Sequence, residues 1–361
     1  MATYTVHILN NAYTTQTVLV NTTNYADILR ISYRLALNDV SSCSIRLAPH
    51  SSKLTSCVAM NRVLLYRDGV LQFGGLILKN GWAIGVAAEE DAYQIDVLGG
   101  EVYLDWRAIE PAALSAYDER TDHADDLAKE YVRHHAASAA DDALRQFSDL
   151  TVEADEAACT SLTEKPRYEN LLEECQKLAK FGAFDFRCVP STTGFVFTTA
   201  YPQWGLDRTF GNGVNTDAVF SLDRRNFSKM TYVKDTLGHY NYLYVAGQGE
   251  GADQTIRERS TAGDIASYKR RERFETASAY EDATVIDNIG DMRLKQMAVI
   301  QGLTVLPLQR TWKNPWDLGD LVTIRADRYG QTYTTDAKIV AINVDVDEDG
   351  TESVTPEMET V

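Results

Sequence analysis

The chain has 361 residues, of which 44% are hydrophobic and 24% charged, and its formal net charge is −17. This composition is typical of globular proteins and excludes the disordered, collagen-like and disulfide-scaffold classes. A chain of this length forms two to four compact units or one large one. The negative charge argues against a protein that grips nucleic acid by its phosphates, because that affinity comes from Lys and Arg.

The hydrophobic runs and the cysteines bear on where the protein resides. No apolar run approaches the roughly 18 residues that a spanning helix needs, and the first residues lack the pattern of a signal peptide. Five cysteines are scattered, with no Cys-x-x-Cys and no Cys/His cluster at zinc spacing. We therefore expect a soluble protein with buried thiols, made in a cytoplasm and without direct membrane insertion. The cysteines are Cys43, Cys57, Cys159, Cys175 and Cys188.

Residues 1–100 have the pattern of a small antiparallel β-barrel or sandwich. Apolar and polar residues alternate in short runs, as at 93–98. The apolar runs 63–66 and 71–77 flank a turn that contains Asp68-Gly69. Such a pair between apolar runs is a strong hairpin signal, because a type I′ turn needs positive φ at both central residues.

Residues 101–205 indicate a helical and mixed α/β middle domain. The stretch 124–147 is rich in Ala with interspersed charge, which is typical of a helix or a helix pair. Residues 184–189 and 195–199 are predicted strands on either side of a turn.

A clearer helix is predicted over residues 166–181. Pro166 suits a first-turn position, and Gly182 suits a C-terminal cap. The apolar residues fall on one face at spacings of three and four: Leu171, Leu172, Cys175, Leu178 and Ala179.

Residues 206–361 return to β structure and form the predicted third domain. One helix is expected within it, over about residues 280–301. Strands are predicted at residues 228–233, 240–246, 303–309, 321–326 and 338–346.

The glycine run Gly247, Gly249 and Gly251 invites interpretation as a phosphate-binding loop. A dinucleotide fingerprint should open a helix in a βαβ unit, whereas the residues that follow here are polar and turn-like. We therefore interpret the run as a flexible loop at a strand end.

Asp345, Asp347 and Asp349, followed by Gly350, resemble the opening of a calcium-binding EF-hand loop. The twelfth position, which should be a bidentate Glu, is Pro356. Since the preceding residues alternate like a strand, a hairpin turn is the simpler interpretation.

His134 and His135, with His123, Asp122 and Asp125 upstream, are possible metal ligands. Adjacent residues on a helix point about 100° apart and cannot share one ion. We therefore predict a solvated helix face, with no metal site and no cofactor.

Several segments together resemble a family of siphophage tail proteins, the Gp37-like proteins, which form tail-tip or baseplate hub components. The resemblance is strongest between residues 166 and 274 and weaker at both ends. Its motifs are Pro166-Arg167-Tyr168-Glu169-Asn170 with the helix that follows, Leu206-Asp207-Arg208-Thr209, Val219-Phe220-Ser221-Leu222-Asp223, Tyr244-Val245-Ala246-Gly247-Gln248-Gly249-Glu250-Gly251 and Arg270-Arg271-Glu272-Arg273-Phe274. Residues 117–142 depart most from the family.

The resemblance implies a β-rich α+β fold with two small antiparallel β-barrel-like hub domains around the mixed middle domain. Three subunits would form a homotrimeric ring of six similar barrels, which adapts the sixfold tail tube to a threefold tip and lets DNA pass. The implied partners are a distal tail protein or tail-tube ring on one side, and a tail fibre, spike or tape-measure protein on the other. The protein would reside in the virion after assembly in the bacterial host, with no enzymatic activity and no sequence-specific binding of nucleic acid.

The motif segments supply the candidate interface residues. The arginines among them are expected to serve packing or subunit contacts, because they sit in motif segments of an otherwise acidic chain. The candidates are Tyr168, Asp207, Arg208, Gly247, Gly249, Gly251, Arg270 and Arg271.

Two other functions stay open at this point. A cell-wall hydrolase would need a catalytic domain, and the sequence has no Gly-x-Ser-x-Gly elbow and no cysteine in a recognisable catalytic frame. A host-glycan-binding tail protein would use some of the 19 Tyr and 5 Trp residues as stacking platforms.

Overall fold

The N-terminal part of the chain is a run of antiparallel strands. The computed structural model describes residues 2–21, 27–49, 51–84, 91–221, 223–307, 312–313, 315–328 and 331–361. Within the described residues before Gly100 the strands are β1 (Tyr4–Leu9), β2 (Thr15–Val20), β3 (Ile28–Ala36), β4 (Ser42–Leu47), β5 (Arg62–Arg67), β6 (Val70–Ala83) and β7 (Ala92–Gly99). Every pairing among them is antiparallel.

The predicted hairpin at Asp68-Gly69 joins β5 to β6 and is confirmed. Asp68 has φ 49° and Gly69 has φ 79°, so both central residues adopt positive φ. This is the backbone that a type I′ turn requires, and it matches the right-handed twist of the two strands.

Strands from the C-terminal part continue the same sheet. These are β13 (Val219–Ser221), β14 (Phe227–Asp235), β18 (Ile300–Pro307), β19 (Leu321–Arg328), β20 (Gln331–Asp347) and β21 (Glu352–Thr360). The first half of β20 pairs with β19, and its second half lies between β3 and β21. In the pairing of β20 with β3, residues Ala341–Asp347 oppose Ala36–Arg30.

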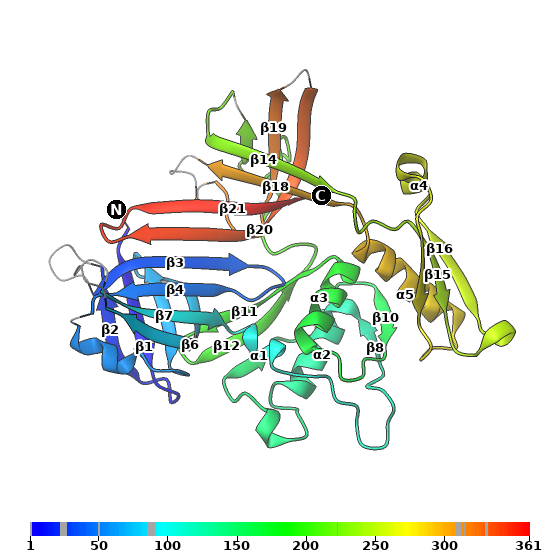
Figure 1. Cartoon of the computed structure of the whole chain (residues 1–361), viewed down its shortest axis with the longest axis horizontal. Helices are drawn as coiled ribbons and strands as arrows, with labels where there is room; N and C mark the ends of the chain where they lie inside the picture. Colours follow the sequence, from blue (N-terminus) through cyan, green and yellow to red (C-terminus); the bar gives the residue numbers. More distant parts are fainter. Residues whose placement is uncertain are drawn as a thin grey trace.

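The described strands form one 13-stranded sheet rather than two separate barrel-like units. Along its main path the order is β14-β18-β21-β20-β3-β4-β7-β6-β5-β1-β2, with β13 and β19 off this path. No closed barrel is found among these strands. The physical reason is that β20 pairs directly with β3, so that the two β-rich ends share one sheet (Figure 1). The expectation of a β-rich α+β fold is confirmed.

The strands from the two ends also share one core. Ile31 and Tyr33 of β3 and Ile342 and Val344 of β20 are buried in the same apolar cluster. Alternate residues of a strand point to opposite faces, so the other face of these strands carries polar side chains.

The middle of the chain packs helices and two small sheets against the large sheet. Its elements are α1 (Val102–Asp105), β8 (Arg120–His123), α2 (Ala124–His135), β9 (Leu150–Val152), β10 (Ser161–Glu164), α3 (Leu171–Gly182), β11 (Asp185–Ser191) and β12 (Gly194–Ala200). The strands predicted at 184–189 and 195–199 are confirmed as the antiparallel pair β11 and β12. A second apolar core lies among these elements.

Helix α3 begins five residues later than predicted. Asn170 is the N-cap, because its side-chain oxygen accepts hydrogen bonds from the backbone N–H groups of Leu172 (2.9 Å) and Glu173 (3.2 Å). Pro166 lies outside the helix. At the other end Gly182 is still helical, and Ala183 adopts the left-handed conformation with φ 55°.

The Ala-rich stretch 124–147 is helical only in its first half. Helix α2 ends at His135, and the chain then turns so that the Phe147 backbone N–H donates to the Ala136 carbonyl. The Phe147 ring stacks on Tyr103 at a centroid distance of 3.9 Å. This contact places the end of the stretch in the second core instead of extending the helix.

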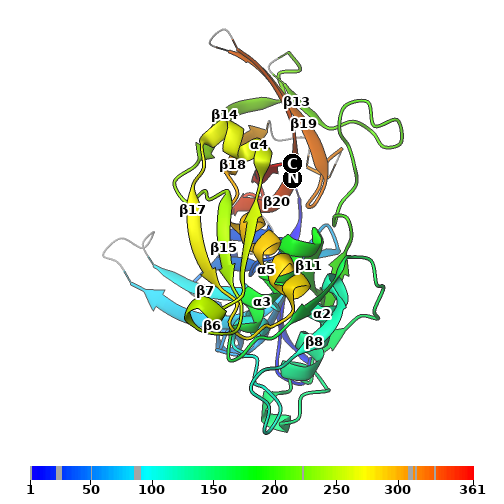
Figure 2. The ribbon, with the colours of Figure 1, turned by 90° about the vertical axis from the view of Figure 1, so that its right-hand side faces the viewer.

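Residues 236–299, here called the insert, form a small unit between the paired strands β14 and β18. The insert contains β15 (Tyr242–Ala246), β16 (Ile256–Ser260), α4 (Ala262–Tyr268), β17 (Glu272–Thr276) and α5 (Ala283–Gln296). Strand β15 lies between antiparallel β16 and parallel β17, and α5 packs against this sheet. Figure 2 views the insert from its own end of the molecule.

The insert modifies two predictions. The helix expected over 280–301 is α5, which is shorter, because residue 300 already begins β18. The strands predicted at 228–233 and 240–246 correspond to β14 and β15, which belong to different sheets.

The hairpin interpretation of Asp345, Asp347 and Asp349 is confirmed. These residues lie at the end of β20 and in its turn into β21, where Gly350 has φ 78° and donates its N–H to the Asp347 carbonyl. Asp345 forms an ion pair with Arg30 of β3 at 3.3 Å.

Candidate interaction surfaces

The structure places the eight candidate residues in three separate regions. Gly247, Gly249, Gly251, Arg270 and Arg271 lie in the insert. Tyr168 precedes α3 in the middle region, and Asp207 with Arg208 lies beside the start of β19.

Arg208 is engaged within its own chain. Its Nε lies 2.8 Å from the Oδ2 of Asp320, whose side chain is almost fully buried. Asp320 also accepts backbone hydrogen bonds from Leu206 (2.6 Å) and Asp317 (2.8 Å). Asp207 accepts from the backbone N–H and the hydroxyl of Thr209. The Arg208–Asp320 ion pair ties the segment before β13 to the turn before β19. A role of Arg208 in contacts between subunits stays a prediction.

Arg270 and Arg271 differ although they are adjacent. The Arg270 guanidinium lies 3.5 Å above the Tyr242 ring and donates to the Tyr244 hydroxyl at 2.7 Å. Arg271 instead donates to the Thr236 carbonyl at 2.5 Å, at the base of the insert. Arg270 therefore belongs to an exposed surface, whereas Arg271 fastens the point where the insert leaves β14.

The glycine run is the loop between β15 and β16. Gly249 and Gly251 have φ 111° and 60°, and an added Cβ at Gly247 would lie 2.4 Å from a methyl carbon of Ile286 in α5. The chain then continues into a short 3-10 helix (Gly251–Asp253) and β16, not into a helix that could hold a phosphate. Close packing and turn geometry account for these glycines.

Tyr168 is exposed, and its backbone has φ 61°. Its N–H donates to the Ile109 carbonyl at 2.7 Å. The Tyr168 side chain is therefore exposed, while its backbone is hydrogen-bonded to the middle region.

One face of the insert sheet is free and aromatic, a feature that the sequence analysis did not identify. The register places Tyr244 beside Glu258 of β16 and Phe274 of β17 on the same face. Phe274 is 59% exposed. The opposite face packs on α5, where Arg257 pairs with Asp287 at 2.5 Å and Arg259 pairs with Asp291 at 2.6 Å. The alternation of Tyr242 and Tyr244 with apolar residues is the sequence signal that could have identified this face.

Among the described strands, the main path of the large sheet ends at two unpaired edges, β14 and β2, and the short strand β13 ends the branch through β19. Strand β14 has nine residues, and its described side chains are exposed or half-buried throughout, with Val233 57% exposed. An edge strand of this length presents a row of backbone N–H and C=O groups that can pair with another chain.

The polar face of the central strands, part of which lies against α3, carries charges that pair with one another. Arg30 of β3 lies 3.3 Å from Asp345 of β20, and Arg34 lies 3.3 Å from Glu357 of β21 and 3.0 Å from Asp39. Such a face is polar without a large surplus of either charge.

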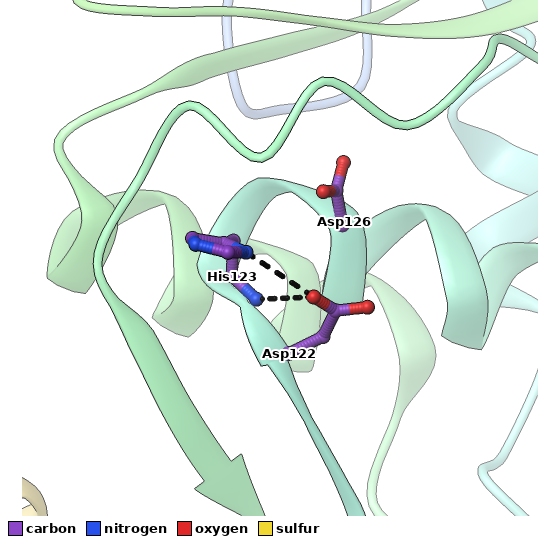
Figure 3. Close-up of side chains that lie close together, drawn as sticks. All are labelled: Asp122, His123 and Asp126. Atoms are coloured by element: carbon purple, nitrogen blue, oxygen red, sulfur yellow. Dashed lines mark hydrogen bonds and ion pairs between the residues drawn. The ribbon is translucent and has the colours of Figure 1, made fainter.

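Asp122, His123 and Asp126 form a group whose ligand atoms lie within 4.8 Å of one another (Figure 3). Asp126 already accepts from the backbone N–H groups of Glu156 (3.0 Å) and Ala157 (2.7 Å). Asp122 accepts from the backbone N–H of His123 at 2.8 Å. These bonds explain the group as the start of α2, while His134 and His135 lie on the last turn of that helix. The predicted solvated face is wrong at His135, which is buried with its Nε2 2.7 Å from the Asp118 carboxylate.

The five cysteines are all free and buried, as predicted. Burial raises the pKa of Cys57 to about 11, so this thiol stays protonated at neutral pH. Among the described residues no helix is long and apolar enough to cross a membrane.

The fold is shared with several tail proteins of known structure. A tail protein of Neisseria meningitidis matches 99% of this chain and 96% of its own length, with 12% sequence identity and a TM-score of 0.59. The 43 kDa tail protein of prophage MuSo2 from Shewanella oneidensis matches 99% and 98%, with 10% identity and a TM-score of 0.63. The prophage tail protein gp18 of Listeria monocytogenes matches 99% and 94%, with 13% identity and a TM-score of 0.59.

Residues 5–358 match the family described as Siphovirus ReqiPepy6 Gp37-like protein. The chain belongs to this family, and the resemblance seen in the sequence is confirmed. No curated protein matches the chain.

Proposed function

We propose that this protein is a structural subunit of a phage tail tip or baseplate hub, without enzymatic activity, that assembles as a homotrimeric ring and resides in the virion. The observation that carries this proposal is the family match over almost the whole chain, together with the fold shared with three tail proteins, two of which come from prophages. In this role the ring adapts the sixfold tail tube to a threefold tip. Its partners are a distal tail or tube protein on one side and a fibre, spike or tape-measure protein on the other.

The open edges of the large sheet support assembly. A cyclic ring needs two different, complementary patches on each subunit, and β14 and β2 are two different unpaired edges of one sheet. In the assembled ring, each subunit contributes its two β-rich ends, which the pairing of β3 with β20 joins in one sheet. The three-domain division at residues 100 and 205 belongs to the same proposal.

The polar face of the central strands suits a surface that DNA passes. Arg30 and Arg34 are held by carboxylates of β20 and β21, so they do not stand free to bind phosphates. Since affinity for DNA comes from cations that neutralise phosphates, such a face permits sliding. We assign this face to the channel.

The test is the mass of the purified protein by native mass spectrometry or light scattering, over a range of concentrations and with the tail-tube partner. A trimer, alone or with the partner, is expected, and a chain that stays monomeric with the partner present contradicts the ring. Val233→Lys on β14 should weaken the trimer, because a charge on an edge strand opposes strand pairing. Leu144→Lys, at another exposed apolar residue, is the matched control and should leave the mass unchanged.

A second candidate function is binding of a host glycan, which the free aromatic face of the insert favours. Phe274 and Tyr244 would serve as stacking platforms, with Glu258 as a hydrogen-bonding group. Titration with purified host cell-wall polysaccharide tests this function. Binding that Phe274→Ala abolishes would support it, and no binding by the wild type or the trimer would exclude it.

A further inference from the structure

Three ionisable side chains share a buried position in the middle region. The Lys177 ammonium lies 2.7 Å from Glu174 and 3.0 Å from Glu164, and the side chains of both glutamates are almost fully buried. One oxygen of each carboxylate, Oε1, is buried without a hydrogen-bond partner among the described residues. With all three groups charged, the cluster holds one negative charge more than its single ammonium balances.

This cluster lies where the insert meets the rest of the molecule. A pocket of about 190 Å³ is lined by Glu164 and Lys177 on one side and by Tyr280, Ile289 and Met292 of the insert on the other. Tyr280 is buried there. Helix α5 contacts both α3 and β10, the two elements that carry the cluster.

Few charges from neighbouring elements compensate the cluster. Glu169, before α3, adds a further negative charge, and the hydroxyls of Tyr131 on α2 and Tyr280 of the insert are neutral. The two other cations at the pocket have their own partners. Arg293 of α5 faces Glu275 at 4.0 Å, and Lys165 pairs with Glu119 at 3.0 Å.

Two hydrogen bonds also join the insert to α3. Lys180 donates to the Gln296 carbonyl at 3.0 Å, and Lys295 donates to the Phe181 carbonyl at 2.8 Å. Both lysines bond to backbone carbonyls near the surface, where water can replace them.

We propose that the Glu164–Lys177–Glu174 cluster is a proton-controlled joint, in which one proton bound by the carboxylates favours the insert seated on α3, and loss of that proton favours its release. A protonated Glu174 leaves a neutral Glu164–Lys177 pair that is compatible with burial. A deprotonated Glu174 leaves an excess charge on the cluster. The cluster gains hydration through Glu164 and Lys177 when the insert moves away, because these two side chains line the pocket that Tyr280 and α5 cover. This inference does not depend on the hub function.

The direction of the effect follows from the proton balance. Burial raises the pKa of Glu174 from its ordinary value of 4.5 to about 7, against the opposing charge of Lys177, and the charge of Glu164 adds to the rise. Between these two values the seated form holds a proton that a hydrated Glu174 would release. The proton-linked preference for the seated form is therefore complete below about pH 4.5, declines as the pH rises, and is lost once the pH has passed through about 7.

The two pKa values of Glu174 also determine how strongly seating of the insert depends on pH. If a released insert restores the ordinary pKa of Glu174, the ratio of released to seated molecules rises roughly tenfold between about pH 6 and about pH 8.5.

Hydrogen–deuterium exchange of the full chain at these two pH values, corrected for intrinsic rates, tests the joint. The backbone amides of α5 should lose about tenfold in protection at the higher pH, while those of β3 and β20 serve as the internal reference. Glu174→Gln should keep α5 protected at both pH values. Glu173→Gln, one residue away on the exposed side of the same helix, is the matched control and should behave as the wild type.

Two results would overturn the proposal. One is a wild type whose α5 protection does not change with pH, and the other is a Glu174→Gln variant that changes as the wild type does. If Glu174→Gln does not fold, Glu164→Gln replaces it. Removal of the neighbouring charge should move the transition to lower pH, and an unmoved transition contradicts the joint.

Discussion

The junction of β3 with β20 and the junction of the insert with α3 hold the molecule together in different ways. The first joins strands that are about 300 residues apart through a ladder of backbone pairs, with Tyr33 and Val344 buried beneath it. The second relies on two lysine–carbonyl bonds, a buried Tyr280 and a charged cluster beside a pocket. The sheet is therefore one mechanical body, whereas the hydrogen bonds that attach the insert lie near the surface, where water can replace them.

The largest expected effect comes from opening the β3–β20 core. Ile342→Ala removes a fully buried side chain and should lower the free energy of unfolding by roughly 2–5 kcal/mol, because the cavity adds to the lost transfer energy. Denaturant unfolding followed by circular dichroism measures it. Val233→Ala on the exposed edge strand is the control, and an equal loss there would contradict the assignment of the core.

The next effect tests whether the insert is dispensable. Because Asp235 and Ile300 oppose each other in the sheet, residues 236–299 can be replaced by an Asn-Gly turn. The remaining protein should fold and lose about 1.5–3 kcal/mol, which is the burial of one large side chain such as Tyr280. An unfolded or aggregated product would show that the insert is part of the core.

A smaller loss of stability is expected from a substitution at the start of α3, the helix that α5 of the insert contacts. Asn170→Ala removes the N-cap and should cost about 1 kcal/mol. Thermal unfolding measures this loss. Asp142→Ala removes the cap of the short 3-10 helix Ala143–Arg145, far from the joint, and should change the stability less.

The smallest effect concerns the polar face above the β3–β20 core. Arg30→Ala breaks the ion pair with Asp345, both partners of which are largely exposed, and should cost roughly 0.2–1 kcal/mol. The loss should vanish in about 1 M salt, since salt screens exposed charges. A larger, salt-independent loss would mean that the pair is desolvated.

Local patterns in the sequence predicted local structure well. The Asp68-Gly69 hairpin, the turn at Gly350 and the pair β11–β12 each depend on a few neighbouring residues, and all three are present. The start of α3 was misplaced, because Asn170 offers a better cap than Pro166 and both precede the same apolar stripe.

Pairings between distant residues could not be predicted in the same way. Nothing local in β3 or β20 specifies that they pair, so the two β-rich ends were interpreted as separate barrels. In the insert, β17 pairs in parallel with β15, and β16 and α4 lie between these two strands in the sequence. No short turn joins β15 to β17, so the sequence carries no turn signal for this pairing. The buried Glu174 escaped notice because it lies between apolar positions on an otherwise amphipathic helix.

The candidate residues show that a sequence motif can reflect contacts within one subunit. Arg208, Arg271 and Gly247 each make a contact within the subunit that explains the residue type. The structure of one subunit does not test contacts between subunits, so the subunit roles of the candidates stay predictions.

The entry and exit of the insert at one end of the β14–β18 pair determine how it would respond to force. A pull on the insert loads both strands from the same end, so the pairing nearest to it, Asp235 with Ile300, would part first and the others would follow one at a time. A pull along the strands of the central sheet would instead load many pairings at once. An object attached to the insert would therefore be held by a compliant tether, while the central sheet stays stiff.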